Sequence, residues 1–413
     1  MYFYNQFIHL KYIILVLVFF IITILPTPSR SQNLKLKSWV NVSSNQLLAN
    51  NDYIHSDLGN NFGTNFHFKK NNISSNLTLA VSKKNNLVFD NSNIEFNLKH
   101  VKFGLGKINR NWSFSPNTSL ILSKNARPSN SIYLIKDSSN SSNRLSSWIG
   151  AWSFETFNSI LSNTDGPQNS MMFGARAVLE PTDDLKIELS KTSQWGGSGY
   201  SSSIPSLKAA ILGNTNEHAH KNINQMAGIG ISYLLPNKKW PLRLYGQLIG
   251  EDEAGWLPSC NMYLAGIEWQ NSKKANNKFG LEIIDTRIDI TTNNNCGPNT
   301  AYNNGTYKYT NYDRVMGVPI DTESKSMNLW GSINISPNLN LHYSLKNLTI
   351  NDSNYSSHRL SSTKESGLIG TAGMNWRYKN AQIISKLHYK NFNINGNNAN
   401  NTINYSLMTI LEF

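Results

Sequence analysis

Three adjacent acidic residues stand in residues 250–255, which read Gly-Glu-Asp-Glu-Ala-Gly. Carboxylates accept hydrogen bonds from hydroxyl groups and also attract cations. Glu251, Asp252 and Glu253 therefore form a candidate binding site for a hydroxyl-rich ligand or a cation. The alternative, which we favour from the sequence, is that these acids pair with arginines inside the fold and stabilise it.

The candidate partners of these acids, or of an acidic ligand, are Arg110, Arg127, Arg176 and Arg243. A guanidinium group presents a planar fork of donors that fits a carboxylate, so these arginines suit an acidic polysaccharide. Pairing with Glu155, Glu251 and Asp252 is the alternative, and again the favoured one.

Trp195 ends an alternating segment and is followed by two glycines. Its ring could stack on a sugar ring while neighbouring groups bond the hydroxyls. A tryptophan that sits at a membrane interface, or that packs under a loop, explains the residue equally well. Trp112, Trp256 and Tyr200 are lesser candidates for stacking.

Residues for catalysis or metal binding are sparse. His218 and His220 lie close together in the sequence, but two histidines are too few for a metal site. Residues 201–203 are serines and Glu217 is nearby, yet no motif orders these groups into a hydrolase triad. We expect no enzyme activity, no metal and no cofactor.

The N-terminus has the three regions of a secretory signal peptide. Lys11 precedes an apolar block at 12–25, and Ser29 and Ser31 occupy the small-residue positions of a cleavage site. We therefore expect a signal peptide in residues 1–31 and a mature chain from 32 to 413. A retained membrane anchor is the alternative.

The C-terminus reads as a strand with one face in lipid. Counting back by twos from Phe413 gives Leu411, Thr409, Leu407 and Tyr405, which share one face of a strand. A terminal Phe behind such a pattern resembles the signal that outer-membrane barrels present to their assembly machinery. Phe413, Leu411 and Tyr405 are the residues that carry this signal.

Connections between the predicted strands alternate between short breaks and long polar stretches. This alternation is typical of outer-membrane barrels, which have short periplasmic turns and longer external loops. We predict an all-β, transmembrane, antiparallel up-and-down β-barrel of about 18 strands. The expected spans are 34–43, 62–70, 73–84, 93–100, 101–109, 131–137, 152–161, 169–180, 185–195, 224–235, 240–251, 262–269, 278–290, 325–335, 339–350, 367–378, 380–393 and 403–413.

Cys260 and Cys296 fall in consecutive long external loops of this topology. Export places the chain in an oxidising compartment, so we expect the two residues to form a disulfide. Free thiols are the alternative. We also expect a short helix in the external loop that contains residues 205–213, because its apolar residues recur at helical spacing.

The composition is compatible with this barrel and excludes some other classes of protein. Mean hydropathy is −0.39 and charged residues are 15% of the chain, which excludes a bundle of transmembrane helices. The formal net charge is +13, but the basic residues are scattered, so we expect no nucleic-acid partner. An Asn-rich soluble β protein fits the composition alone equally well.

Six segments resemble the Wzi family of capsule-assembly outer-membrane proteins, in the order of that family: 103–112, 119–128, 149–154, 189–197, 245–255 and 257–269. A weaker similarity covers 304–309 and 314–317. The resemblance implies an 18-stranded barrel and a lectin-like role. In one respect the chain differs, because relatives have a helical segment early in the barrel and residues 32–100 read as strands.

The resulting hypothesis is a monomeric protein of the bacterial outer membrane that binds capsular or other surface polysaccharide. Its remaining partners would be outer-membrane lipid and the barrel-assembly machinery. A passive porin-type channel shares the predicted topology and is the alternative function. The identity of the polysaccharide, and whether the lumen is open or plugged, stay open at this stage.

Overall fold

The computed structural model describes residues 34–44, 59–82, 87–140, 148–213, 222–236, 241–254, 257–271, 277–290, 296–392 and 401–413. Eighteen antiparallel strands form one sheet. In chain order they are β1 (Leu34–Ser43), β2 (Asn61–Lys70), β3 (Ile73–Ser82), β4 (Asn93–Leu98), β5 (Val101–Lys107), β6 (Asn130–Asn140), β7 (Ala151–Ile160), β8 (Met171–Glu180), β9 (Leu185–Trp195), β10 (Asn224–Leu234), β11 (Leu242–Ala254), β12 (Leu257–Asn271), β13 (Asn277–Asp285), β16 (Lys325–Ser336), β17 (Leu339–Ile350), β18 (Glu365–Tyr378), β19 (Ala381–Lys390) and β20 (Thr402–Glu412).

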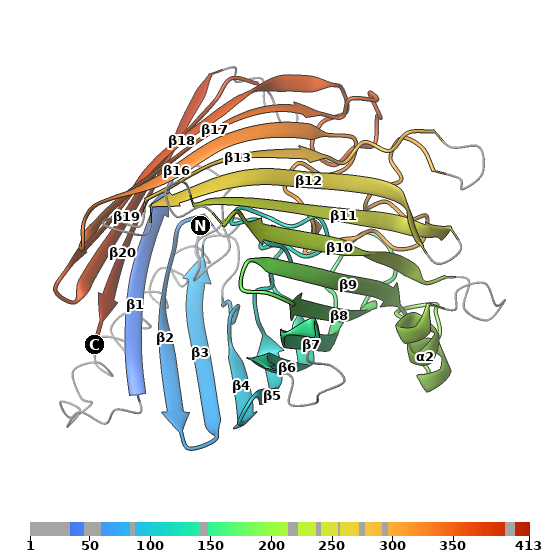
Figure 1. Cartoon of the computed structure of the whole chain (residues 1–413), viewed down its shortest axis with the longest axis horizontal. Helices are drawn as coiled ribbons and strands as arrows, with labels where there is room; N and C mark the ends of the chain where they lie inside the picture. The colour runs from blue at the N-terminus through green and yellow to red at the C-terminus, as the bar shows by residue number, and fades with distance from the viewer. Residues whose placement is uncertain are drawn as a thin grey trace, which may run out of the picture.

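The first and last strands close the sheet into a barrel. β1 pairs with β2 on one side and with β20 on the other, and β1 and β20 lie side by side in Figure 1. Phe413 extends this closure, because its main-chain amide donates to the Leu36 carbonyl oxygen at 2.9 Å. Tyr405, Leu411 and Phe413 are exposed on the outer surface.

Side chains alternate between the two faces of the wall, as the period of a strand requires. On β12, Tyr263 and Ile267 are 53% and 37% exposed, whereas Leu264 and Glu268, which follow them, are buried. Apolar side chains on the outer face form the band that meets lipid in barrels of this type. The inner face carries the polar and charged residues.

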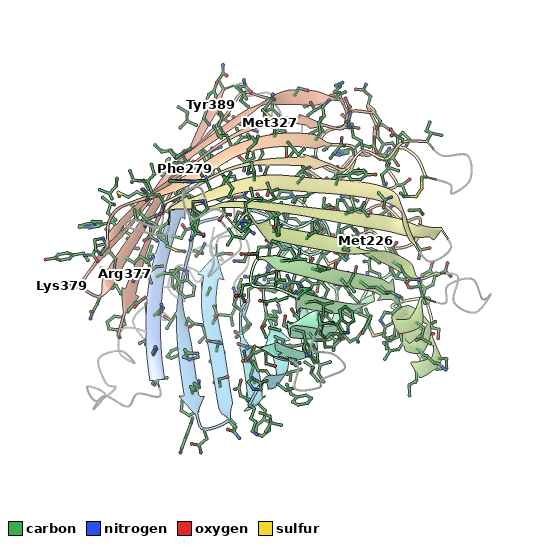
Figure 2. All side chains as sticks on the ribbon, in the orientation of Figure 1. Met226, Phe279, Met327, Arg377, Lys379 and Tyr389 are labelled. Atoms are coloured by element: carbon green, nitrogen blue, oxygen red, sulfur yellow. A yellow bond between two sulfur atoms is a disulfide. The ribbon has the colours of Figure 1, made fainter. Side chains whose placement is uncertain are left out.

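The connections differ in length between the two ends of the barrel. Residues 71–72, 99–100, 337–338 and 379–380 make tight turns at one end, which we call the short-turn end. Figure 2 places Arg377 and Lys379 at this end, beside the turn between β18 and β19. The opposite end, which we call the long-loop end, carries the long connections. Among the described residues, no helix is long and apolar enough to cross a membrane.

The predicted fold is confirmed, and the predicted strand spans agree closely with the observed ones. The spans 34–43, 185–195 and 339–350 coincide with β1, β9 and β17. The largest difference lies around residues 251–261, which we expected to form a loop. There β11 continues to Ala254 and β12 begins at Leu257, so the two strands extend as a long hairpin.

Two segments from the long-loop end fold back into the lumen. The first lumenal segment is residues 108–129, between β5 and β6, and the second is residues 296–324, between β13 and β16. The second contains a small hairpin of β14 (Thr310–Asn311) and β15 (Arg314–Val315). Both segments share one apolar core with inward-facing wall residues. Part of the lumen is therefore filled, by loops rather than by a helical segment.

The expected short helix is present as α2 (Ile204–Leu212), in the connection between β9 and β10. Ser203 caps its N-terminus by accepting a hydrogen bond from the Ser206 amide, and Gly213 ends it in the left-handed conformation. These are the usual start and stop signals of a helix. In Figure 1 the helix lies at the far end of β9, away from the chain termini.

Candidate functional site

The inner wall holds the first lumenal segment through polar side chains. Gln247 on β11 donates to the Trp112 carbonyl oxygen at 2.6 Å and accepts from the Leu120 amide at 2.8 Å. Arg243 donates to the Phe114 carbonyl oxygen at 2.8 Å. These bonds supply partners to main-chain groups of the segment, as burial requires, and the Trp112 carbonyl also accepts from the Ser119 hydroxyl at 2.6 Å.

Each of the four predicted arginines lies inside the barrel in an ion pair. Arg110 pairs with Glu155 at 2.7 Å, Arg127 with Asp90 at 2.7 Å, Arg176 with Glu188 at 2.5 Å and Arg243 with Glu268 at 2.5 Å. Glu155 also accepts a bond from the Trp112 indole at 2.9 Å. Of these four acids, the sequence analysis had proposed only Glu155 as a partner.

Arg110 illustrates what this pairing achieves. Burial lowers the pKa of its guanidinium, and the neighbouring Glu155 carboxylate opposes that shift. The guanidinium also lies over the ring of Phe157, 3.9 Å from its centre. A buried cation is tolerated only when paired and bonded in this way. The arginines therefore pair with acids inside the fold, as the alternative in the sequence analysis expected. Binding of polysaccharide by these arginines stays a prediction.

The acidic cluster lies near the long-loop end of β11. Glu251 is buried and 7% exposed. Asp252 and Glu253 follow in the same strand, with their backbones opposite Ser259 and Pro258 on β12, but their side chains are outside the described residues. A binding role for the cluster therefore remains a prediction.

Trp195 is almost fully buried, with 3% of its side chain exposed, and its indole donates to Asn158 at 3.2 Å. By strand parity it faces outward from β9, because Gln194 before it faces the lumen and bonds the Lys308 carbonyl oxygen. Neither face of the ring is open to a sugar in this conformation. Stacking by Trp195 stays a prediction that requires the covering residues to move.

The lesser aromatic candidates are placed differently from one another. Trp112 is buried in the lumenal core. Tyr200 is half-buried, with its ring centre 5.7 Å from that of Tyr307. Trp256 and the two histidines at 218 and 220 lie outside the described residues. Among the residues described, no group of three or more His, Cys, Asp or Glu could hold a metal ion.

Cys260 and Cys296 form the expected disulfide, with their Cα atoms 5.4 Å apart. The bridge joins β12 to the start of the second lumenal segment. Both residues belong to the lumenal core. The disulfide therefore fixes the point at which the second segment enters the barrel.

Buried tyrosines hold the second lumenal segment in place. Tyr302 donates to the Leu120 carbonyl oxygen at 2.6 Å, which ties the two segments together. The hydroxyls of Tyr309 and Thr192 lie 2.8 Å apart, and Tyr307 donates to the Gly196 carbonyl oxygen at 2.9 Å. Burial raises the pKa of Tyr302, Tyr307 and Tyr309, so all three hydroxyls stay protonated at neutral pH.

A hollow at the long-loop end is lined by strands β8 to β12 and by residues 298–305 of the second lumenal segment. Its lining comes from both faces of the wall. On the inner side it includes four asparagines, which we call the amide recess: Asn224, Asn299, Asn303 and Asn304. Tyr355, which is 37% exposed, lines the same hollow.

The amide recess has the chemistry that a neutral or weakly charged sugar requires. An asparagine amide both donates and accepts, as a sugar hydroxyl does, and an exposed tyrosine ring offers an apolar surface. Asn299 Oδ1 and Ser190 Oγ are buried here and have no hydrogen-bond partner among the described residues. Arg176, whose side chain is 21% exposed, and Glu251 complete the polar lining.

The sequence analysis did not identify this recess. Asparagine is abundant throughout the chain, so four particular asparagines carry no separate signal. They come from β10 and the second lumenal segment, and only the inward fold of that segment brings them together.

Comparisons with known proteins identify the family and the fold. A protein-family model described as "Capsule assembly protein Wzi" matches residues 35–402. An uncharacterised 55.8 kDa protein in the cps region of Klebsiella pneumoniae is 34% identical over 147 residues, which is 35% of this chain and 29% of that protein. The chain thus spans less than a third of this curated relative.

Solved structures agree with the architecture. The barrel is similar to Wzi of Escherichia coli, described as a carbohydrate-binding β-barrel of the outer membrane involved in group 1 capsule assembly, with a TM-score of 0.78 at 21% identity over 92% of this chain and 84% of that one. It is also similar to OprD of Pseudomonas aeruginosa, with a TM-score of 0.53 at 10% identity over 92% and 94%. At these identities the similarity shows the fold.

Proposed function

Because this chain belongs to the Wzi family of capsule assembly proteins, we propose that it binds capsular or related exopolysaccharide and helps attach or assemble it at the cell surface. The chain is an outer-membrane barrel. The long loops of such barrels face the exterior, so the long-loop end faces the surface polysaccharide. The proposal is for a lectin-like protein without a catalytic step.

The observation that carries this proposal is the amide recess at the long-loop end. Its asparagines, the unpartnered oxygen atoms of Asn299 and Ser190, and the exposed ring of Tyr355 supply groups for hydroxyls and for a sugar face. Buried polar atoms usually have a partner. A bound saccharide, or the water that it displaces, would satisfy these two.

The alternative of a passive channel receives less support. Two segments fill the lumen beside β5 to β13 and are fixed there by ion pairs, tyrosine hydroxyls and a disulfide. Such a construction narrows the lumen and gives a binding site at the long-loop end a rigid floor. The description of Escherichia coli Wzi as a carbohydrate-binding barrel supports the same choice.

The remaining expectations complete the proposal. The N-terminal 31 residues, which lie outside the described ones, would direct export and be removed. Phe413, with Tyr405 and Leu411, would present the C-terminal strand to the assembly machinery before β20 pairs with β1. The mature barrel would act as a monomer, since its sheet is closed and offers no free edge.

Retention of polysaccharide on cells tests the proposal. The variants Asn299→Ala and Tyr355→Ala remove recess groups, and Asn380→Ala changes an exposed residue in a turn at the short-turn end. We expect the first two to release polysaccharide into the medium at unchanged barrel levels, and Asn380→Ala to retain it. Normal retention by both recess variants would contradict binding at this recess.

A further inference from the structure

The connection between β9 and β10 places helix α2 on the outer face of the barrel. Ser193 faces outward from β9, yet it is fully buried, and its hydroxyl donates to the Ala210 carbonyl oxygen at 2.8 Å. Lys191, on the same outward face, donates to the Ile211 carbonyl oxygen at 3.2 Å. These two contacts fix the helix against the side of the wall that meets lipid.

The side of this helix that packs on the wall carries small residues, and the opposite side exposes large apolar residues. Ser206, Ala209 and Ala210 are buried against the wall, and they are small. The opposite face carries Ile204, Ile211 and Leu212, which are 83%, 43% and 67% exposed. In water this face would leave large apolar side chains unburied, and a soluble surface helix normally places such residues against the core.

The height of the helix on the wall corresponds to a membrane interface. Leu189, Ile229 and Leu248 are register neighbours and belong to the outer face. Ser193 lies four residues beyond Leu189 along β9, which is about 13 Å at the rise of a strand. The helix thus lies just beyond the apolar band, at the level where amphipathic helices rest in a bilayer.

A groove on the outer wall reaches the helix at Lys191, which lines the groove and bonds the Ile211 carbonyl oxygen. On its outward side the hollow described above is lined by small residues, Ala175 and Ala177 on β8 and Ala227 on β10, with Leu189 and Ile229 beside them. Small residues between larger ones leave a shallow apolar trough of the kind that an acyl chain fills. Lys191 lines this groove, and Lys208 is exposed on α2, on the same face as Ile204, Ile211 and Leu212.

We propose that α2 lies in the outer leaflet and, with this groove, binds an anionic lipid. The acyl chain would lie along the alanine trough, and the headgroup anion would meet Lys208 and Lys191, as cations at a membrane surface attract acidic headgroups. Three observations favour this occupant: the groove is continuous with the lipid-facing band, the free face of α2 is apolar, and the two lysines are cationic. The proposal depends on the outer-membrane location and not on polysaccharide binding.

Depth of the helix can be measured with a single fluorophore. Both native cysteines are in the disulfide, so Ile211→Cys introduces one reactive thiol for a bimane label. Ile229→Cys reports the lipid-facing wall, and Ser357→Cys reports an exposed position at the long-loop end. In vesicles with brominated acyl chains we expect quenching at 211 to match that at 229 and to exceed that at 357 several-fold. Quenching at 211 equal to that at 357 would overturn the placement.

Lipid retention tests the anionic site. Lys208→Gln removes the exposed cation of α2, and Lys379→Gln removes a cation at the short-turn end as a matched control. After exchange into vesicles of phosphatidylglycerol and phosphatidylcholine and mild detergent extraction, we expect Lys208→Gln to keep at most half the phosphatidylglycerol that wild type keeps, by native mass spectrometry. Equal retention by wild type and Lys208→Gln would overturn the anionic site, whatever the polysaccharide assay shows.

Discussion

Gln247 on the barrel wall donates to the carbonyl oxygen of Trp112 in the first lumenal segment at 2.6 Å. Both residues are buried. The same amide accepts from the Leu120 amide and donates to Glu188 at 3.2 Å. One side chain thus joins the wall, the lumenal segment and an ion pair, and the stability of the inner structure should depend on it.

Replacing Gln247 tests how much these hydrogen bonds stabilise the fold. Gln247→Leu removes the acceptor of the Leu120 amide, whereas the Trp112 carbonyl keeps its bond from the Ser119 hydroxyl. An unsatisfied buried group costs about 1–3 kcal/mol. We expect a lower midpoint of unfolding in detergent. Gln382→Leu is the matched control, because Gln382 donates to Asn375 alone among the side-chain bonds found. Equal midpoints of unfolding for the two variants would contradict the stabilising role of Gln247.

Arg176 separates a structural role from a binding role. It faces Glu188, which is fully buried, so Arg176→Met leaves an uncompensated charge and should cost roughly 3–5 kcal/mol of unfolding free energy. Adding Glu188→Gln should recover most of that loss, since no buried charge remains. If Arg176→Met instead leaves stability unchanged and weakens saccharide binding, the arginine acts on ligand.

The disulfide closes a loop of 36 residues between Cys260 and Cys296. In the chain-entropy description a bridge over a loop of this length stabilises by about 4 kcal/mol. We expect the double variant Cys260→Ser, Cys296→Ser to fold into the same barrel and to be cut by protease within the second lumenal segment. Protease resistance equal to that of wild type would show that the tyrosine contacts alone hold the segment.

Alkaline pH should loosen the lumenal segments. Burial raises the pKa of Tyr302, Tyr307 and Tyr309, so their contribution to stability is full below the unfolded value of about 10 and is lost as pH rises above it. Each buried tyrosine adds up to about 1.4 kcal/mol of loss per pH unit. Urea unfolding between pH 9 and 11 measures the slope, and Tyr302→Phe should reduce it. An unchanged slope in Tyr302→Phe would count against this account.

The wall could be predicted from the sequence because strand periodicity is local information. β17 spans 339–350 as expected, since its exposed and covered residues alternate without interruption. The burial of Trp195 could not be predicted in this way, because it depends on contacts with other strands, such as the hydrogen bond to Asn158 on β7.

The lumenal segments could not be predicted, because their burial depends on distant partners. Residues 119–123 contain a short apolar run, and Leu120 and Ile121 are fully buried. Such a run is compatible with a strand or a core segment. Partners more than a hundred positions away hold it in the lumen, among them Gln247 on the wall and Tyr302 in the second lumenal segment. The amide recess depends on the same packing.

The most direct test of the central claim is binding of the purified, detergent-solubilised protein to the surface polysaccharide of its own host, titrated with salt. We predict saturable binding that Asn299→Ala and Tyr355→Ala weaken at least several-fold, that Asn380→Ala preserves, and that salt weakens if the polymer is acidic. A further loss in Trp195→Ala would extend the site to that ring. No binding at any salt concentration, together with steady ion conductance in a planar bilayer, would contradict the lectin role and identify a channel.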